Sequence, residues 1–336
     1  MNAARLRNAA KIVVTVGVLA YLLMRLNEQD GFSRIVAEPK HWPSLAAALA
    51  LVLLGFSLNF TRWYLLVVGL GIPFKLTDAF RLGSLGVMLS QVTPGSLGGD
   101  VIKGVFIARE QPGRRAEAVA TIVIDRVVGL YAMLLVTSVG LIVAEATTNP
   151  GKVVRSIEFV IWIAAAVGTA GIAAALSNYA SHPNLRGIAS AAPLISDGLH
   201  RVIDALESYR LHRRRVLTAI GLAAMTHISL ILAFWFIGRG LPVQAPTLVQ
   251  NCWIAPVSMV IGAIPGLPGG LGQLESAIEY FYQSIGAPAG DGVMVALAFR
   301  GMVYVMAAAG GAYYFSAKKK VNELFEQAEH MDEQPT

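Results

Sequence analysis

Hydrophobic positions along the chain gather into eight long runs that are separated by shorter polar stretches. The runs are 10–26, 44–66, 80–111, 117–144, 157–176, 216–238, 247–286 and 291–316. A helix that crosses a bilayer needs about 20 mostly apolar residues. Six runs have this character and are predicted as full membrane spans. The other two, 80–111 and 247–286, are interrupted near their middle by proline and glycine.

The two interruptions share one pattern. The first lies in SQVTPGSLGGDVIKG at 90–104 and the second in GAIPGLPGGLGQLES at 262–276. Proline removes a backbone donor and clashes with the preceding helical turn, while glycine tolerates tight turns. Each arm of a broken run has about 15 residues, or about 22 Å as helix, which is short of a hydrocarbon core of about 30 Å. Both runs are therefore predicted as re-entrant hairpins.

Basic residues give the hairpins opposite orientations, because Lys and Arg favour the cytoplasmic side. The N-terminus, both flanks of 80–111, the loop 177–215 and the stretch after 316 are basic. The flanks of 247–286 carry Arg239 as their only basic residue. We therefore expect the first hairpin to enter from the cytoplasm and the second from outside, with both termini cytoplasmic. The basic residues assigned to the flank before the first hairpin are Arg62, Lys75 and Arg81.

The two hairpins belong to an internal repeat. Pro94, Gly95, Gly98 and Gly99 recur with the same spacing as Pro265, Gly266, Gly269 and Gly270. An acid follows each break, and an arginine lies in the next apolar run: Asp100 with Arg126, and Glu275 with Arg300. Inverted repeats with broken helices near the midplane are typical of secondary transporters. The predicted fold is an all-α polytopic membrane protein with about six full spans and two oppositely oriented re-entrant hairpins.

The chain is expected to form a single transmembrane domain over 1–320. Its first repeat covers 44–144 and its second 216–316. Between them, 157–215 is predicted as a linker span followed by an amphipathic helix at 195–209 on the cytoplasmic surface. The tail at 321–336 is polar and is expected to be solvated.

Composition supports a membrane chain and narrows the chemistry. Hydrophobic residues make up 55% of the chain and charged residues 14%, against about 25% charged in soluble domains. The single cysteine, Cys252, excludes an intrachain disulfide and argues against a cysteine metal site. The six histidines show no metal-ligand spacing, and His227 is predicted as a packed or hydrogen-bonded residue. We expect no cofactor and no nucleic-acid partner.

Charges inside the apolar runs are the candidate functional residues, because charge within a membrane is costly and usually functional. Asp100 and Lys103 share a helix face and can pair. Asp125 and Arg126 are adjacent and point about 100° apart, so they do not simply neutralise each other. Arg126 then needs Asp100, Glu275 or a ligand phosphate as partner.

Two compatible interpretations of the buried charges stay open. The pairs Arg126–Asp100 and Arg300–Glu275 could be structural, or the arginines could bind phosphate, which suits their planar fork. In a transporter, Asp100, Asp125 and Glu275 would either hold the gates closed or titrate, and titration would couple movement of the lipid to protons. No catalytic or metal residue is predicted. The candidate substrate-binding residues are Pro94, Gly95, Gly98, Gly99, Asp100, Lys103, Asp125, Arg126, Gly266, Gly269, Gly270, Glu275 and Arg300.

Two ordered signatures carry a family resemblance. TPGSLGGDVIKG followed by TIVIDRVVGLYA, and IPGLPGGLGQLESA followed by ALAFRGMVY, resemble the lysylphosphatidylglycerol synthase transmembrane domain family of flippase-like membrane proteins. The resemblance covers about residues 10–316. It implies a domain that moves a lipid between leaflets, in some members an aminoacylated phosphatidylglycerol. No soluble aminoacyl-transferase domain follows residue 316, so we expect that the chain does not make that lipid itself.

The leading hypothesis is a translocator in the plasma membrane for a phosphate-bearing lipid headgroup, either phospholipid or polyprenyl phosphate, and not an enzyme. One alternative is a membrane-embedded enzyme acting on a lipid-linked headgroup, with Asp100 or Glu275 as base. Another is an accessory subunit of envelope biosynthesis. The expected partners are the bilayer and a membrane lipid. A homo-oligomer and association with enzymes of the envelope pathway both stay open.

Overall fold

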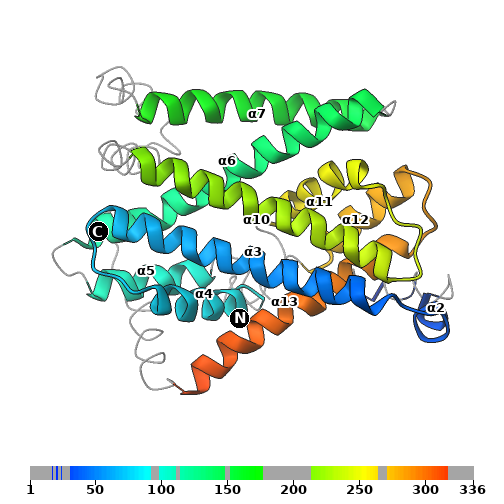
Figure 1. Ribbon diagram of the computed structural model, residues 1–336, viewed down its shortest axis with the longest axis horizontal. Coiled ribbons are helices and arrows are strands. Elements are labelled where there is room, and N and C mark those ends of the chain that lie inside the picture. Colours follow the sequence, from blue (N-terminus) through cyan, green and yellow to red (C-terminus); the bar gives the residue numbers. More distant parts are fainter. Residues whose placement is uncertain are drawn as a thin grey trace, which may run out of the picture.

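The computed structural model describes residues 17, 20, 21 and 24 and the ranges 31–91, 98–110, 114–147, 152–176, 213–263 and 271–316. Within these ranges every regular element is a helix (Figure 1). In chain order they are α2 (Gly31–Ala37), α3 (Trp42–Gly69), α4 (Leu76–Ser90), α5 (Gly98–Glu110), α6 (Arg115–Thr147), α7 (Lys152–Leu176), α10 (Arg213–Gly240), α11 (Leu248–Ala263), α12 (Gln273–Ser284) and α13 (Asp291–Ser316).

Four of these helices are long and apolar enough to cross a membrane, so the chain is a multi-pass membrane protein. The qualifying stretches are Trp42–Gly69, Glu117–Val143, Arg213–Gly240 and Asp291–Ser316. The shorter apolar stretches are Glu158–Ala174 and Leu248–Gly262. The span predicted at 157–176 thus corresponds to the second, shorter class. Most of the span predicted at 10–26 lies outside the described residues, as does all of the amphipathic helix at 195–209.

The start of α3 shows how local sequence fixes a helix end. The Ser44 backbone N–H donates to His41 Nδ1 at 3.3 Å, which caps the helix. Pro43 occupies the first turn, where its missing N–H costs no hydrogen bond. The chain is therefore directed into a long apolar helix immediately after a polar segment.

Each broken run forms two short helices that pack against each other, α4 with α5 and α11 with α12; that these helix pairs are re-entrant stays a prediction. Their arms have 15 and 13 residues in α4 and α5, and 16 and 12 in α11 and α12. At 1.5 Å per residue no arm exceeds about 24 Å, which is less than the hydrocarbon core of about 30 Å. The connections 92–97 and 264–270 lie outside the described residues. The predicted site residues on them are Pro94, Gly95, Gly266, Gly269 and Gly270, together with the repeat position Pro265.

The two halves, α3–α6 and α10–α13, pack reciprocally (Figure 1). Helix α3 packs along α10, α4 of the first hairpin packs on α13 of the other half, and α11 of the second hairpin packs on α6. The first hairpin opens at the end of the molecule where α3 finishes, and the second opens at the opposite end. Oppositely directed halves with exchanged contacts are what an inverted repeat produces.

Hydrogen bonds between connections fix the two ends. At the first end Arg114 donates to Leu70 O at 2.7 Å, which joins the α5–α6 connection to the α3–α4 connection. At the other end the Gln244 backbone N–H donates to Asp291 Oδ2 at 2.6 Å. Each hairpin is therefore anchored at its open end to a different end of the bundle.

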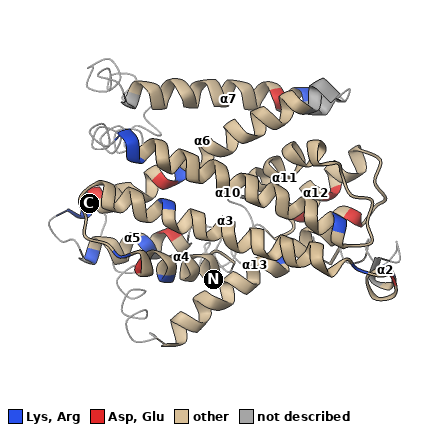
Figure 2. Ribbon diagram, in the orientation of Figure 1, with Lys and Arg blue, Asp and Glu red and all other residues tan. Residues whose placement is uncertain are grey.

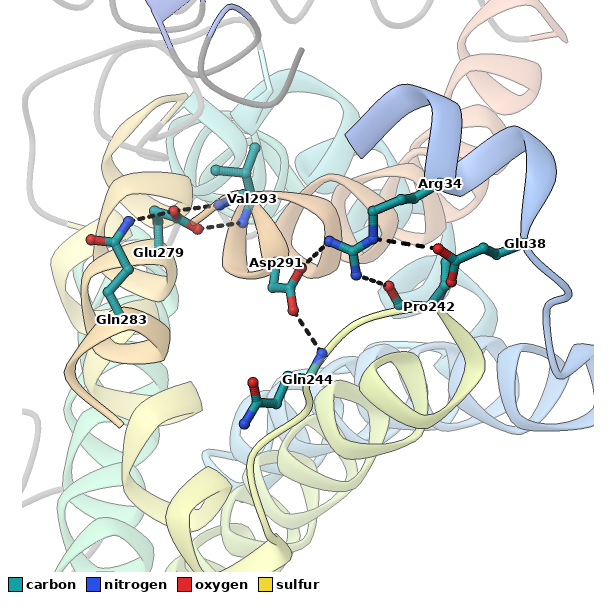
Figure 3. A network of polar contacts seen from close by, with 9 residues as sticks. Arg34, Glu38, Pro242, Gln244, Glu279, Gln283, Asp291 and Val293 are labelled. Carbon is teal, nitrogen blue, oxygen red and sulfur yellow. Dashed lines mark hydrogen bonds and ion pairs between the residues drawn. The ribbon is translucent and has the colours of Figure 1, made fainter. Parts of the chain in front are cut away.

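Helix α2 lies in the polar stretch between the apolar runs 10–26 and 44–66, where the sequence pattern predicted no element. Arg34 of this helix donates to Asp291 Oδ1 at 2.9 Å and also to Pro242 O (Figure 3). Asp291 is fully buried. Close by, Glu279 of α12 accepts from the backbone N–H groups of Gly290 and Val293 at the start of α13. The second hairpin, α13 and α2 are thus tied together at one end of the molecule.

Candidate functional site

Charged side chains are scarce along the long helices, where most of the ribbon carries none (Figure 2). One interior group surrounds Asp100, in the first turn of α5. Its carboxylate accepts a hydrogen bond from Arg126 Nε of α6, and Lys103 Nζ lies 3.6 Å from Asp100 Oδ1. The predicted Asp100–Lys103 and Asp100–Arg126 pairs are therefore both present. Lys103 is buried and lies 5.1 Å from the ring centre of Trp63.

The second interior group surrounds Glu275, in the first turn of α12. Arg300 Nε of α13 donates to Glu275 Oε1 at 2.5 Å, and the Gly272 N–H donates to Oε2 at 2.8 Å. Gly272 has φ of +84°, a conformation that glycine adopts without steric cost. The turn before α12 thereby aims one backbone donor at the fully buried carboxylate. The predicted Glu275–Arg300 pair is confirmed.

The two groups have the same order of acid and arginine along the chain, but their arginine side chains differ in exposure to solvent. In each, the acid lies in the first turn of the helix after a break and the arginine comes from the following long helix. The Arg126 side chain is 51% exposed, whereas that of Arg300 is 8% exposed. The arginine of the first half is therefore about half exposed, and that of the second half lies in the interior.

A third interior pair joins Arg62 of α3 to Asp125 of α6, with Arg62 Nε 2.7 Å from Asp125 Oδ1. Assigning Arg62 to the basic flank before the first hairpin was wrong, because α3 continues past it to Gly69 and buries its side chain. The only signal in the sequence was a charge close to the end of an apolar run. As predicted, the neighbours Asp125 and Arg126 have different partners.

The interior charges line two adjoining cavities. The first-half cavity, of about 540 Å³, has in its wall Arg62, Gly99, Asp100, Lys103, Asp125 and Arg126. The second-half cavity, of about 310 Å³, has Arg300 in its wall. The two cavities share the wall residues Asn59, Thr226, His227 and Met259. The tertiary structure thus places an arginine of each half in the wall of one of two cavities that share part of their lining.

The first-half cavity suits an anion. Three bases and two acids lie in its wall: Arg62, Lys103, Arg126, Asp100 and Asp125. Away from bulk water an excess of positive charge attracts anions more strongly than at a surface. Guanidinium groups present several donors in a plane, a geometry that matches phosphate oxygens.

The remaining predicted residues have the following places. Gly98 begins α5. The Glu275 carboxylate accepts hydrogen bonds from Arg300 and from the Gly272 backbone. His227 Nε2 lies 3.1 Å from Gly129 O, so the predicted hydrogen-bonded role of this histidine is confirmed. Among the described residues no group of three or more His, Cys, Asp or Glu side chains could hold a metal ion.

A comparison with protein families decides the classification. The family model described as the lysylphosphatidylglycerol synthase TM region matches residues 8–311. The chain belongs to this family. The match includes both hairpins and all three interior ion pairs. The comparison with curated proteins gives no match. As a lysylphosphatidylglycerol synthase TM region, the chain is a multi-pass membrane domain, in agreement with its four long apolar helices.

Proposed function

We propose that the chain moves a phosphate-bearing lipid headgroup, of a phospholipid or a polyprenyl phosphate, between the two leaflets of the plasma membrane. One observation carries the proposal. Two arginine–carboxylate pairs lie at equivalent places in oppositely directed halves, and their arginines line two cavities that share a wall. A device with an anion site in each of two inverted halves has the symmetry that two-sided access requires.

The proposed path begins at the more exposed arginine. Arg126 and Lys103 meet the phosphate in the first-half cavity, where the ligand competes with Asp100 for the guanidinium. The headgroup then passes the shared wall and reaches Arg300, whose present partner is Glu275. Exchange of one anionic partner for another keeps each arginine paired throughout, which limits the cost of charge in the membrane. The acyl chains stay in the lipid.

The proposal includes re-entrant hairpins and cytoplasmic termini. Basic residues lie toward the open end of the first hairpin: Arg81 in α4, Arg109 in the last turn of α5 and Arg114 just before α6. The positive-inside tendency then places this end in the cytoplasm and the open end of the second hairpin outside. A headgroup captured at the first-half cavity accordingly comes from the cytoplasmic leaflet.

We propose no chemical step on the lipid. Asp100, Asp125 and Glu275 are each hydrogen-bonded to an arginine. A general base must lie within hydrogen-bond reach of the proton that it abstracts. In each of these acids a guanidinium already occupies one carboxylate oxygen.

Leaflet exchange of labelled phosphatidylglycerol and labelled polyprenyl phosphate in proteoliposomes tests the proposal. We expect the wild type to accelerate exchange of at least one lipid. The variant Arg126→Gln/Arg300→Gln should slow this exchange at least about tenfold, because charge-assisted hydrogen bonds to the phosphate are lost. Arg155→Gln is the matched control, since Arg155 is exposed on α7 and lines neither cavity.

Folding of each variant is checked by its thermal unfolding midpoint in the same detergent. A folded wild type that exchanges neither lipid faster than empty liposomes contradicts the proposal. That outcome would favour a membrane-embedded enzyme or an accessory subunit, and a search for covalently altered lipid would follow. Equal exchange by wild type and the double variant would contradict the role of the arginines.

A further inference from the structure

The wall between the two cavities contains polar groups of a different kind from those deeper in each cavity. Its residues are Asn59 of α3, Thr226 and His227 of α10 and Met259 of α11. None of these side chains is a carboxylate, a lysine or an arginine. A headgroup that moves from one cavity to the other passes this wall, so its groups determine which headgroups pass.

Asn59 differs from Thr226 and His227 in that neither end of its side-chain amide is used within the described residues, whereas His227 leaves only its Nδ1 atom without a partner. Thr226 Oγ1 donates to Leu222 O at 2.9 Å, and His227 Nε2 is 3.1 Å from Gly129 O. The amide of Asn59 has no hydrogen-bond partner among the residues that the structure describes, although it lies within a 28-residue apolar helix.

Its neighbours on α3 satisfy their own groups. Ser57 Oγ donates to Leu53 O at 2.8 Å, and Thr61 Oγ1 donates to Ser57 O at 2.8 Å. Asn59 is partly exposed and lines both cavities, so its amide is open to a molecule that occupies them. A primary amide on an otherwise apolar helix favours a polar group of that molecule as its partner.

We propose that Asn59 selects headgroups that carry hydroxyl groups beside their phosphate. This inference rests on the proposed function and adds the chemistry that distinguishes one phospholipid from another. A primary amide offers two N–H donors and a carbonyl acceptor. A hydroxyl donates one hydrogen bond and accepts others, so it can meet both ends of the amide. The arginines bind the phosphate that all these lipids share, and Asn59 forms hydrogen bonds with the uncharged hydroxyl groups of the headgroup.

Phosphatidylglycerol and phosphatidylmethanol are suitable probes, because both are singly charged phosphodiesters and only the first has headgroup hydroxyls. With identical acyl chains they compete for purified protein in nanodiscs, and the bound ratio is measured. We expect the wild type to prefer phosphatidylglycerol by about threefold to tenfold, the factor that one net hydrogen bond contributes. Asn59→Leu, of similar size and suited to an apolar helix, should reduce the ratio to about one.

Three comparison variants make the result specific. Asn59→Gln keeps the amide and should retain a preference for phosphatidylglycerol. Ser57→Ala lies on the same helix, lines neither cavity and should leave the ratio unchanged. Arg126→Gln/Arg300→Gln should weaken binding of both lipids without changing the ratio. A wild type without preference, or an unchanged preference in Asn59→Leu, overturns the inference.

The binding ratio is read without translocation, so the inference and the proposed function fail separately. Leaflet exchange is measured on the same protein samples. A preserved preference without exchange contradicts the proposed function but leaves Asn59 as a selective binding residue. Exchange that is equally fast for both lipids in the wild type, together with equal binding, contradicts the role of Asn59 alone.

Discussion

Each of three interior carboxylates is held by an arginine from another helix. Asp100 binds Arg126, Asp125 binds Arg62 and Glu275 binds Arg300. Removing two charges from water costs several kcal/mol per ion, and attraction between them offsets this only with good geometry. The Arg62–Asp125 pair has that geometry, at 2.7 Å with both side chains almost fully buried.

The Arg62–Asp125 pair leads to a prediction at the residue scale. Arg62→Leu leaves the Asp125 carboxylate buried without its arginine, and loss of one partner of a buried pair costs about 3–5 kcal/mol. We therefore expect a clearly lower thermal unfolding midpoint in detergent. The double variant Arg62→Leu/Asp125→Leu removes both charges and should recover most of the loss. A single variant as stable as the wild type would show that the pair contributes nothing.

At the scale of helices, the arms of the first hairpin cross at two glycines. A Cβ atom added to Gly99 of α5 would lie 2.5 Å from Gly86 O of α4, which is backbone and cannot turn away. Small residues at such crossings let two helices approach closely enough for their backbones to contact. The crossing also positions Asp100, the next residue, at the wall of the first-half cavity.

Gly99→Ala should therefore separate α4 from α5. We expect it to lower stability by about 1–3 kcal/mol, the usual effect of inserting an atom into a well-packed site. Gly221→Ala is the matched control, because nothing lies within 4 Å of the Cβ position on this glycine of α10. Alanine there should be neutral or stabilise by up to about 1 kcal/mol. Equal unfolding midpoints for the two variants would contradict the close crossing.

At the scale of the whole molecule, the opposite openings of the hairpins can be tested by labelling. Cys252 is the only native cysteine, so Cys252→Ser gives a clean background. Lys75→Cys and Thr247→Cys then place single exposed thiols just before α4 and α11. A membrane-impermeant maleimide should label Thr247→Cys from outside in intact cells, and Lys75→Cys only in inverted vesicles. Labelling of both from the same side would contradict the inverted repeat.

The network around Asp291 gives a second prediction for the whole molecule. This buried carboxylate accepts from Arg34 of α2 and from the Gln244 backbone, and so joins three parts of the chain (Figure 3). Asp291→Asn removes the charge from both bonds, and hydrogen bonds to charged groups are worth about 1.5–3 kcal/mol. Hydrogen exchange in α2 should accelerate about tenfold or more, while exchange in α4 and α5 stays unchanged. Unchanged exchange in α2 would contradict this anchoring role.

The sequence by itself determined the features that depend on neighbouring residues. Long apolar runs determine the spanning helices, and the proline and glycine breaks determine where two of them become hairpins. Repeated spacing of acid and arginine predicted the pairs Asp100–Arg126 and Glu275–Arg300, which the structure contains. These features could be predicted because helix period and the cost of charge in an apolar run act locally. The depth of the hairpins in the membrane stays a prediction.

Only the tertiary structure decided what meets across helices from distant parts of the chain. In the sequence, Arg62 has the position of a charge that flanks a membrane helix. The packing of α3 on α6 instead brings Arg62 to Asp125. Asn59 was one polar residue in an apolar run until two cavities were found to share it. The polar stretch before α3 gave no sign that Arg34 would reach Asp291. Pairing and cavities depend on which faces of separate helices come together, and no pattern along one segment contains that information.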